Sequence, residues 1–383
     1  MTFNFDELPN RRATESAKWR ATAEDVLPMW VADMDFRSPP AVMAALHTRV
    51  DHGVFGYPMP PEEIKESVVD WLSRRHGWEV DPEALVLIPG VVTGFNLAAH
   101  AVTRPGDGVL VQTPTYGPFF GVAKNANLVQ QEMELPCGAD GRYTLDLEAF
   151  NAAISRRTRI FMLCNPQNPT GRVFRKDELE AMAEICLRNE IITCSDEIHS
   201  DLVYSGQKHT PISSLSPEIA DQTITLIAPS KTFNIAGLEA SVAIIPNKEL
   251  RKQFEGARKG LAGWVNLLGM VAMQAAYAEG EGWLEALLGY LEANRDFTHA
   301  FVARELPGVA MAKPEGTYLA WLDCRKAGIE GKPSEFFKEQ ARVMLNDGAW
   351  FGQGGEGFVR LNFGCPRSML AEALGRMKTA LRG

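Results

Sequence analysis

The middle of the chain alternates short apolar runs with segments of helical spacing. The runs are rich in β-branched residues and too short for helices, so they predict strands buried on both faces. Such strands separated by helices predict an α/β fold, in which helices cover both faces of a mainly parallel sheet. The predicted strands comprise residues 85–88, 109–111, 158–164, 191–194, 223–227 and 241–245. Residues 91–101 and 176–188 are predicted helices, the second with an inner face of Leu179, Met182, Ala183 and Ile185.

The pattern changes near residue 285. A long helical pattern ends near residue 304, and shorter predicted strands at 317–322 and 358–363 then alternate with helices. At about 150 residues per domain, the length predicts two or three domains. We predict an N-terminal arm with part of a small domain (1–50), a large domain (51–285) and a smaller α+β C-terminal domain (286–383).

Composition excludes several classes of protein. A net charge of −9 argues against nucleic acid or an anionic membrane as the main partner. Six scattered cysteines without a CxxC pair, and an N-terminus without a secretory pattern, predict a cytoplasmic protein. Residues 260–278 carry no charge and match a membrane span in length, but they include Asn266 and Gln274, so we interpret them as a buried helix.

Polar residues follow three of the predicted strands. The turn 165–171 (NPQNPTG) follows the strand 158–164, Asp196 follows 191–194, and Lys231 follows 223–227. Ligands bind at the carboxyl ends of the strands in doubly wound sheets. Pyridoxal phosphate requires an amine that forms a Schiff base and an acid that pairs with its pyridinium nitrogen. The sequence therefore predicts a site for this cofactor at one edge of the sheet.

Motifs in a fixed order extend over nearly the whole chain: WVADMDF (30–36), GVFGY (53–57), NPQNPTG (165–171), SDEIH (195–199), SKTFNIAGL (230–238) and FVRLNFGCPR (358–367). Together they resemble fold-type I pyridoxal phosphate enzymes of the class I/II aminotransferase superfamily. More narrowly, they resemble the MalY/PatB branch of cystathionine β-lyases, which includes cystalysin. The resemblance implies a fold-type I transferase fold and a homodimer.

The resemblance also implies roles for single residues. Lys231 corresponds to the lysine that binds the cofactor covalently and moves the Cα proton, and Asp196 to the partner of the pyridine nitrogen. Asn168 corresponds to the amide beside the ring oxygen, and His199 stands where many relatives have a tyrosine near that oxygen. Tyr116 corresponds to the aromatic residue stacked on the ring. Each residue also has a structural alternative. In the order given above, these are a solvated lysine, a helix N-cap, a turn residue, a structural histidine and a core tyrosine.

Two further residues concern the substrate and the neighbouring subunit. Arg360 corresponds to the arginine that binds the substrate α-carboxylate through a matching fork of hydrogen bonds. Val359, Leu361 and Phe363 alternate with it, which independently places Arg360 on the other face of its strand. A structural ion pair is the alternative. Tyr57 corresponds to a tyrosine that reaches the cofactor region of the neighbouring subunit, with a surface aromatic residue as the alternative.

The phosphate site departs from the family pattern. The family binds phosphate at the start of a helix, here the backbone amides of Gly90, Val91 and Val92. Many aminotransferases also have a serine three residues before the lysine and an arginine eight residues after it, but this chain has Ala228 and Glu239 there. Ser230 and the Tyr57 hydroxyl are the predicted substitutes.

The same residues serve more than one reaction. The resemblance favours elimination of a thiol from cystathionine or a cysteine-type thioether, which yields pyruvate and ammonia. Transamination with a 2-oxo acid is the alternative, and local spacing does not decide between them. A regulator with this fold usually has a DNA-binding domain in front, and no helix-turn-helix pattern precedes Pro28.

A further motif is typical of a different class of protein. Residues 352–357 match G-x-G-x-x-G, a dinucleotide-binding pattern, but they lead into a predicted strand instead of following one. We interpret them as a loop.

Overall fold

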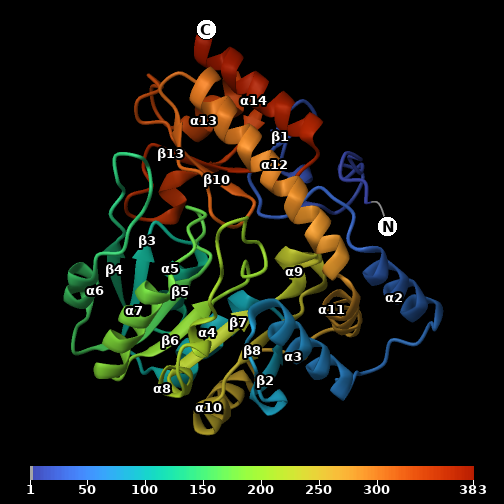
Figure 1. The fold of residues 1–383 in the computed structure, drawn as a ribbon, viewed down its shortest axis with the longest axis vertical. Helices are drawn as coiled ribbons and strands as arrows, with labels where there is room; N and C mark the ends of the chain where they lie inside the picture. Colours follow the sequence, from blue (N-terminus) through green and yellow to red (C-terminus); the bar gives the residue numbers. More distant parts are fainter. Residues whose placement is uncertain (1–2) are drawn as a thin grey trace.

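The computed structural model describes residues 3–383. Its large part is built on a seven-stranded sheet in the order β2-β8-β7-β6-β5-β3-β4 (Figure 1). Only β8 runs against its neighbours, which confirms the predicted mainly parallel sheet. The strands are β2 (Leu85–Ile88), β3 (Gly108–Thr113), β4 (Val129–Glu134), β5 (Thr158–Cys164), β6 (Ile192–Asp196), β7 (Thr223–Ile227) and β8 (Ser241–Ile244).

Helices cover both faces of this sheet. One face packs against α4 (Val91–Val102), α5 (Pro118–Asn125) and α10 (Lys248–Arg258). The other packs against α6 (Leu147–Ala153), α7 (Lys176–Arg188) and α8 (Pro217–Asp221). The predicted inner face of α7 is buried in this second core. Strands β2, β7 and β8 are buried along their whole length, as expected for strands with apolar neighbours on both sides.

The register of the central strands sets the position of the functional edge. Cys164 at the end of β5 is paired with Asp196 at the end of β6, and Asp196 is paired with Leu226 near the end of β7. The carboxyl ends of these three strands therefore lie side by side. The segments that follow them, including α9 (Pro229–Thr232), emerge at the same edge.

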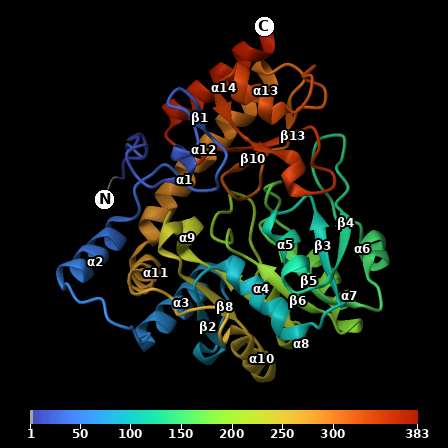
Figure 2. The same cartoon turned by 180° about the vertical axis from the view of Figure 1, so that it is seen from behind.

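A smaller part is formed around a four-stranded antiparallel sheet in the order β12-β13-β10-β9. Figure 2 labels β10 and β13, the two central strands of this sheet. Its strands are β9 (Ala310–Met311), β10 (Leu319–Asp323), β12 (Asn346–Asp347) and β13 (Phe358–Asn362). Its helices are α12 (Glu281–Glu305), α13 (Pro333–Gln340) and α14 (Arg367–Arg382). The predicted boundary near residue 285 falls within the first turns of α12, which connects the two parts (Figure 1).

The N-terminal segment contacts both parts. Strand β1 (Leu27–Pro28) pairs in parallel with β11 (Val343–Met344) of the smaller part. Helix α2 (Pro40–Asp51) packs against α11 (Leu267–Glu279), as does α3 (Glu62–His76). The remaining short elements are α1 (Ala17–Arg20) and the 3-10 turns η1 (Pro82–Ala84), η2 (Ile212–Ser214), η3 (Ala236–Leu238) and η4 (Gly348–Phe351).

The prediction of one buried helix over residues 260–278 is wrong for its first third. Helix α11 begins at Leu267, because the side chain of Asn266 accepts a hydrogen bond from the Gly269 N–H and caps the helix there. The residues before it form a loop in which Leu261 and Trp264 are exposed. Within residues 3–383, no helix has the length and apolarity needed to cross a membrane. Residues 352–357 form a loop that leads into β13, as interpreted from the sequence.

Candidate active site

A cavity of about 770 Å³ opens where the carboxyl ends of β5, β6 and β7 face the smaller part. This volume is typical of sites for small ligands. Ten of the eleven predicted site residues line it: Gly90, Val91, Val92, Tyr116, Asn168, Asp196, His199, Ser230, Lys231 and Arg360. The eleventh, Tyr57, is fully exposed on the loop between α2 and α3 and does not line this cavity.

An acid and an amine with shifted pKa values share the cavity. Asp196 is the last residue of β6, and burial raises the pKa of its carboxyl group to about 7. Lys231 lies on α9, and removal of its ammonium group from water lowers the pKa of Lys231 to about 8. Its Nζ donates a hydrogen bond of 2.6 Å to the carbonyl oxygen of Ala32. At neutral pH this lysine is therefore much closer to its neutral, nucleophilic form than a surface lysine.

His199 is buried and neutral. Burial lowers the pKa of its imidazole well below the usual value. Its ring packs edge to face against Tyr318, with 5.8 Å between the ring centroids, and its Nδ1 has no hydrogen-bond partner among residues 3–383. A buried polar atom of this kind costs stability unless it finds a partner. The arrangement leaves His199 Nδ1 available to a ligand.

Arg360 presents a buried guanidinium to the same cavity. Its Nη1 donates to Asn168 Oδ1 (2.9 Å) and its Nη2 to the Trp30 carbonyl (2.7 Å). The guanidinium lies over the ring of Phe351, and its Nε has no partner among the described residues. Burial lowers the pKa of Arg360 to about 10, so the group is still charged at neutral pH. A buried cation with an unpaired donor is suited to binding a carboxylate.

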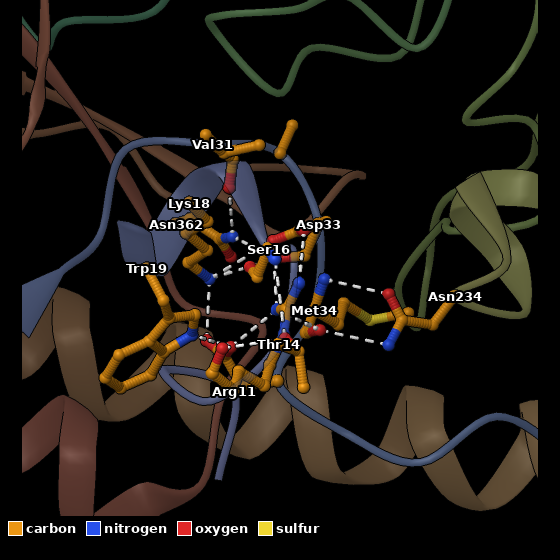
Figure 3. A network of polar contacts seen from close by, with 12 residues as sticks. Arg11, Thr14, Ser16, Lys18, Trp19, Val31, Asp33, Met34, Asn234 and Asn362 are labelled. Carbon is orange, nitrogen blue, oxygen red and sulfur yellow. Dashed lines mark hydrogen bonds and ion pairs between the residues drawn. The ribbon is translucent and has the colours of Figure 1, made fainter. Parts of the chain in front are cut away.

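Residues 30–36, which we call the cover segment, connect the amine and the guanidinium. Its carbonyl groups accept the hydrogen bonds of Lys231 and Arg360 described above. Asn362, two residues after Arg360, donates to the carbonyls of Val31 and Asp33. Asn234, three residues after Lys231, bonds to both backbone groups of Met34 (Figure 3). Sequence reasoning noted this segment as a motif but assigned it no role, since its partners are about 200 or more residues away.

Buried ion pairs and hydrogen bonds link the cover segment to the N-terminal arm. Asp35 is fully buried and accepts hydrogen bonds from Lys18 Nζ (2.6 Å), Arg11 Nη1 (2.7 Å) and Trp19 Nε1 (2.8 Å). Arg11 also pairs with Asp33 at 2.7 Å, and both residues are labelled in Figure 3. The N-terminal arm thus holds one wall of the cavity in place.

Replacement of Asp35 by asparagine is expected to lower the free energy of unfolding by about 3 kcal/mol, because it leaves the buried ammonium of Lys18 without its nearest counter-charge. Urea unfolding followed by circular dichroism measures the change. Asp25→Asn is the matched control, since it removes an aspartate paired with Arg342 at the surface and should change stability far less. Equal effects of the two substitutions would contradict the anchoring role.

The residues of the cavity fit pyridoxal phosphate. Asp196 is suited to pair with the ring nitrogen, and Lys231 is suited to bond to the aldehyde carbon. The free Nδ1 of His199 is suited to hydrogen-bond to a substituent of the ring. Helix α4 begins at the cavity wall, where its first amide groups have no partner within the helix. Glu239 also lines the cavity, which is a departure from a purely cationic phosphate site, while Ala228 does not.

Comparisons with known proteins agree with this fit. The model of the class I and II aminotransferase family matches residues 24–377. The cystathionine β-lyase PatB of Bacillus subtilis (strain 168) is 45% identical, with 99% of this chain and 100% of PatB covered. The structure of cystalysin from Treponema denticola, which contains pyridoxal 5'-phosphate, has a TM-score of 0.96 at 35% identity, with 100% of this chain and 99% of cystalysin covered.

A further solved structure, the C-S lyase from Staphylococcus hominis with bound pyridoxal phosphate, has a TM-score of 0.93 at 34% identity, with 99% of each chain covered. The fold is thus the fold-type I fold of pyridoxal phosphate enzymes, with its ligand cavity at the edge expected from the sequence. The chain belongs to the class I and II aminotransferase family.

Proposed function

We propose that this protein is a pyridoxal phosphate-dependent C–S β-lyase acting on L-cystathionine or a related cysteine thioether. The reaction consumes one water and yields pyruvate, ammonia and a thiol. The bond between Cβ and sulfur breaks, and sulfur leaves with the electron pair and takes up a proton. The convergence of Lys231, Asp196 and Arg360 in one cavity supports this proposal, together with full-length similarity to proteins named cystathionine β-lyase and C-S lyase.

The cavity residues divide the binding of the cofactor among them. When bound, pyridoxal phosphate supplies a pyridinium ring that stabilises negative charge at the substrate Cα. Asp196 would keep the ring nitrogen protonated, and Asn168 and His199 would lie beside the ring oxygen. Tyr116 would stack on the ring. The backbone amides of Gly90, Val91 and Val92, with the Ser230 hydroxyl, would hold the phosphate.

Lys231 and Arg360 act on the substrate. A pKa of about 8 leaves a useful fraction of Lys231 neutral at pH 7 to 8, so its Nζ can take the proton from Cα. To do so, Nζ must leave the carbonyl of Ala32. Arg360 binds the α-carboxylate through its guanidinium, and Asn168 orients that guanidinium by accepting a hydrogen bond from Nη1. Because the carboxylate is held in one position, the Cα–H bond of the substrate is oriented towards the amine of Lys231.

Arg360→Met is expected to raise the KM for amino acid substrates about 100-fold, because it removes the charged, bidentate partner of the carboxylate. Cofactor binding should persist, since Asp196, Lys231 and the start of α4 are unchanged. Steady-state kinetics and the absorbance of the bound cofactor measure the two effects. Arg367→Met is the control, since Arg367 donates to Asn294 and does not line the cavity. A wild-type KM in Arg360→Met would exclude the carboxylate role.

Product analysis tests the reaction itself. The purified protein is incubated with L-cystathionine, and pyruvate and free thiol are quantified. A parallel reaction contains 2-oxo acid acceptors and is analysed for new amino acids. Pyruvate and thiol in equal amounts support the lyase. A new amino acid without pyruvate would instead show that the protein is an aminotransferase and not a lyase.

We also propose a homodimer with shared active sites. Four large apolar side chains are exposed on the loop between α2 and α3: Val54, Phe55, Tyr57 and Met59. Exposed apolar clusters mark interaction surfaces. A second copy of this chain that covers the loop would receive the Tyr57 side chain at its own cavity. The six free cysteines support the expected cytoplasmic location of this dimer.

Mixing Tyr57→Ala with Lys231→Ala tests the shared site. Each variant alone is expected to be nearly inactive. After subunit exchange, about a quarter of wild-type activity should return, because half of randomly paired dimers are heterodimers and each has one intact site. Native mass spectrometry verifies the exchange. No recovery in verified heterodimers would contradict the sharing of Tyr57.

A further inference from the structure

The cavity extends beyond the residues assigned to the cofactor and the α-carboxylate. Its far side, which we call the distal wall, belongs to the smaller part of the molecule. Residues of α13, β12 and η4 form this wall: Ser334, Glu335, Lys338, Asn346, Asp347 and Trp350. None of these side chains has a role in binding the cofactor or the α-carboxylate.

The two carboxylates of the distal wall share one cation. Lys332 lies 3.8 Å from the carboxylates of both Glu335 and Asp347. Asp347 also caps η4 by accepting a hydrogen bond from the Ala349 N–H at 3.0 Å. Lys338, by contrast, has no carboxylate within ion-pair distance among residues 3–383. The wall therefore offers an unpaired cation to the cavity.

Neutral hydrogen-bond donors accompany this cation. Neither the Ser334 hydroxyl nor the Asn346 amide has a side-chain partner within the described part of the chain. Asn346 on β12 is directly opposite Arg360 on β13. Directly opposite residues share one face of a sheet, with Cβ atoms about 5 Å apart. The wall thus begins one strand away from the group assigned to the α-carboxylate and continues outward to α13.

Trp350 supplies an apolar surface on the distal wall. It is 45% exposed, and its ring contacts Tyr116 edge to face at 5.8 Å between ring centroids. An alkyl thioether chain that runs from the cofactor towards Lys338 would cover this ring. The lining of the cavity thus combines a guanidinium, an apolar side chain and an ammonium.

We propose that the distal wall recognises a carboxylate at the far end of the leaving thiol, with Lys338 as the specificity-determining residue. The preferred substrates are then cysteine thioethers whose sulfur substituent ends in a carboxylate. This inference rests on the proposed lyase function and narrows its substrate class. Glu335 and Asp347 already contact Lys332, whereas Lys338 has no ion-pair partner among the described residues, so Lys338 is the charged group assigned to the ligand.

Three substrates of similar length test the proposal: S-(2-carboxyethyl)-, S-propyl- and S-(2-aminoethyl)-L-cysteine. The wild-type enzyme is expected to show a kcat/KM for pyruvate release about fivefold higher with the carboxyethyl than with the propyl substrate. High salt should reduce this preference, because Lys338 is exposed to solvent. Lys338→Met should abolish it while leaving the kcat/KM of the propyl substrate unchanged. Lys338→Glu should shift the preference towards the aminoethyl substrate.

Lys378→Met is the matched control. It makes the same change in net charge on α14, where Lys378 pairs with Glu305 at 2.7 Å outside the cavity, and should retain the preference. Equal kcat/KM values for the charged and neutral substrates in the wild type, or an unchanged preference in Lys338→Met, would overturn the distal site. Absence of pyruvate from all three substrates would instead overturn the lyase function.

Discussion

Replacement of Lys231 by alanine is expected to lower kcat at least ~1,000-fold, because proton transfer by a positioned base contributes about 100- to 10,000-fold and no other group replaces its covalent bond to the cofactor. The yellow absorbance of the lysine-bound cofactor should also disappear. Pyruvate release and absorbance spectra measure both effects. The folded structure should persist, since the one hydrogen bond of Lys231 Nζ within residues 3–383 goes to the backbone carbonyl of Ala32.

Chemical rescue separates loss of the amine from general damage. Methylamine is small enough to enter the space left by the lysine side chain and should restore part of the activity of Lys231→Ala. The rescue should increase with pH, because only the neutral amine takes up a proton. Wild-type turnover in Lys231→Ala without added amine would exclude the mechanism proposed here.

Asp196→Asn is expected to have two opposite effects. The kcat should fall about 100-fold or more, because the neutral amide no longer favours protonation of the ring nitrogen. The cofactor-free protein should become more stable at pH 8, by on the order of 2 kcal/mol, because the substitution removes a fully buried negative charge. If Asp196 serves catalysis at the expense of stability, its replacement should reduce activity and increase stability.

The gain in stability should depend on pH in a defined direction. Burial raises the pKa of Asp196 from 3.8 in the unfolded chain to about 7 in the folded protein. Between these values the folded state binds more protons, so the wild type loses stability as pH rises from 4 to 7. The advantage of Asp196→Asn should therefore be near zero at pH 4 and complete above pH 7. Urea unfolding of both proteins across this range measures it.

The exposed substitution Asp177→Asn is the control and should show no such gain. A variant at Asp196 that is less stable than the wild type at pH 8, or that retains full activity, would contradict the assignment of this carboxylate to the ring nitrogen.

Elements with a strong local pattern were predictable. The strands at residues 158–164 and 223–227 and the helix at 176–188 have the predicted bounds, because each strand is one short apolar run and the apolar residues of the helix follow one helical period. Strand β4 was not predicted. Its sequence, VQQEME, is polar except at Val129 and Met133, because it lies at the edge of the sheet and only Met133 is buried. An edge strand can have a polar sequence and still form its hydrogen bonds.

By itself, the sequence determined which side chains meet at the edge of the sheet. Lys231, Asp196 and Asn168 each come just after or at the end of a buried strand, and parallel strands bring such positions together. This inference needs only local patterns and the geometry of parallel sheets. The predicted residue types and their order along the chain also indicated the cofactor.

Only the tertiary structure decided which residues surround these side chains. The cover segment bonds to Lys231 and Arg360 across about 200 and 330 residues, and the distal wall comes from α13 and β12 of the smaller part. These contacts depend on how the two parts and the N-terminal arm pack, not on the period of any one segment. The shifted pKa values have the same origin, since burial of Asp196 and Lys231 results from all the elements that close around them.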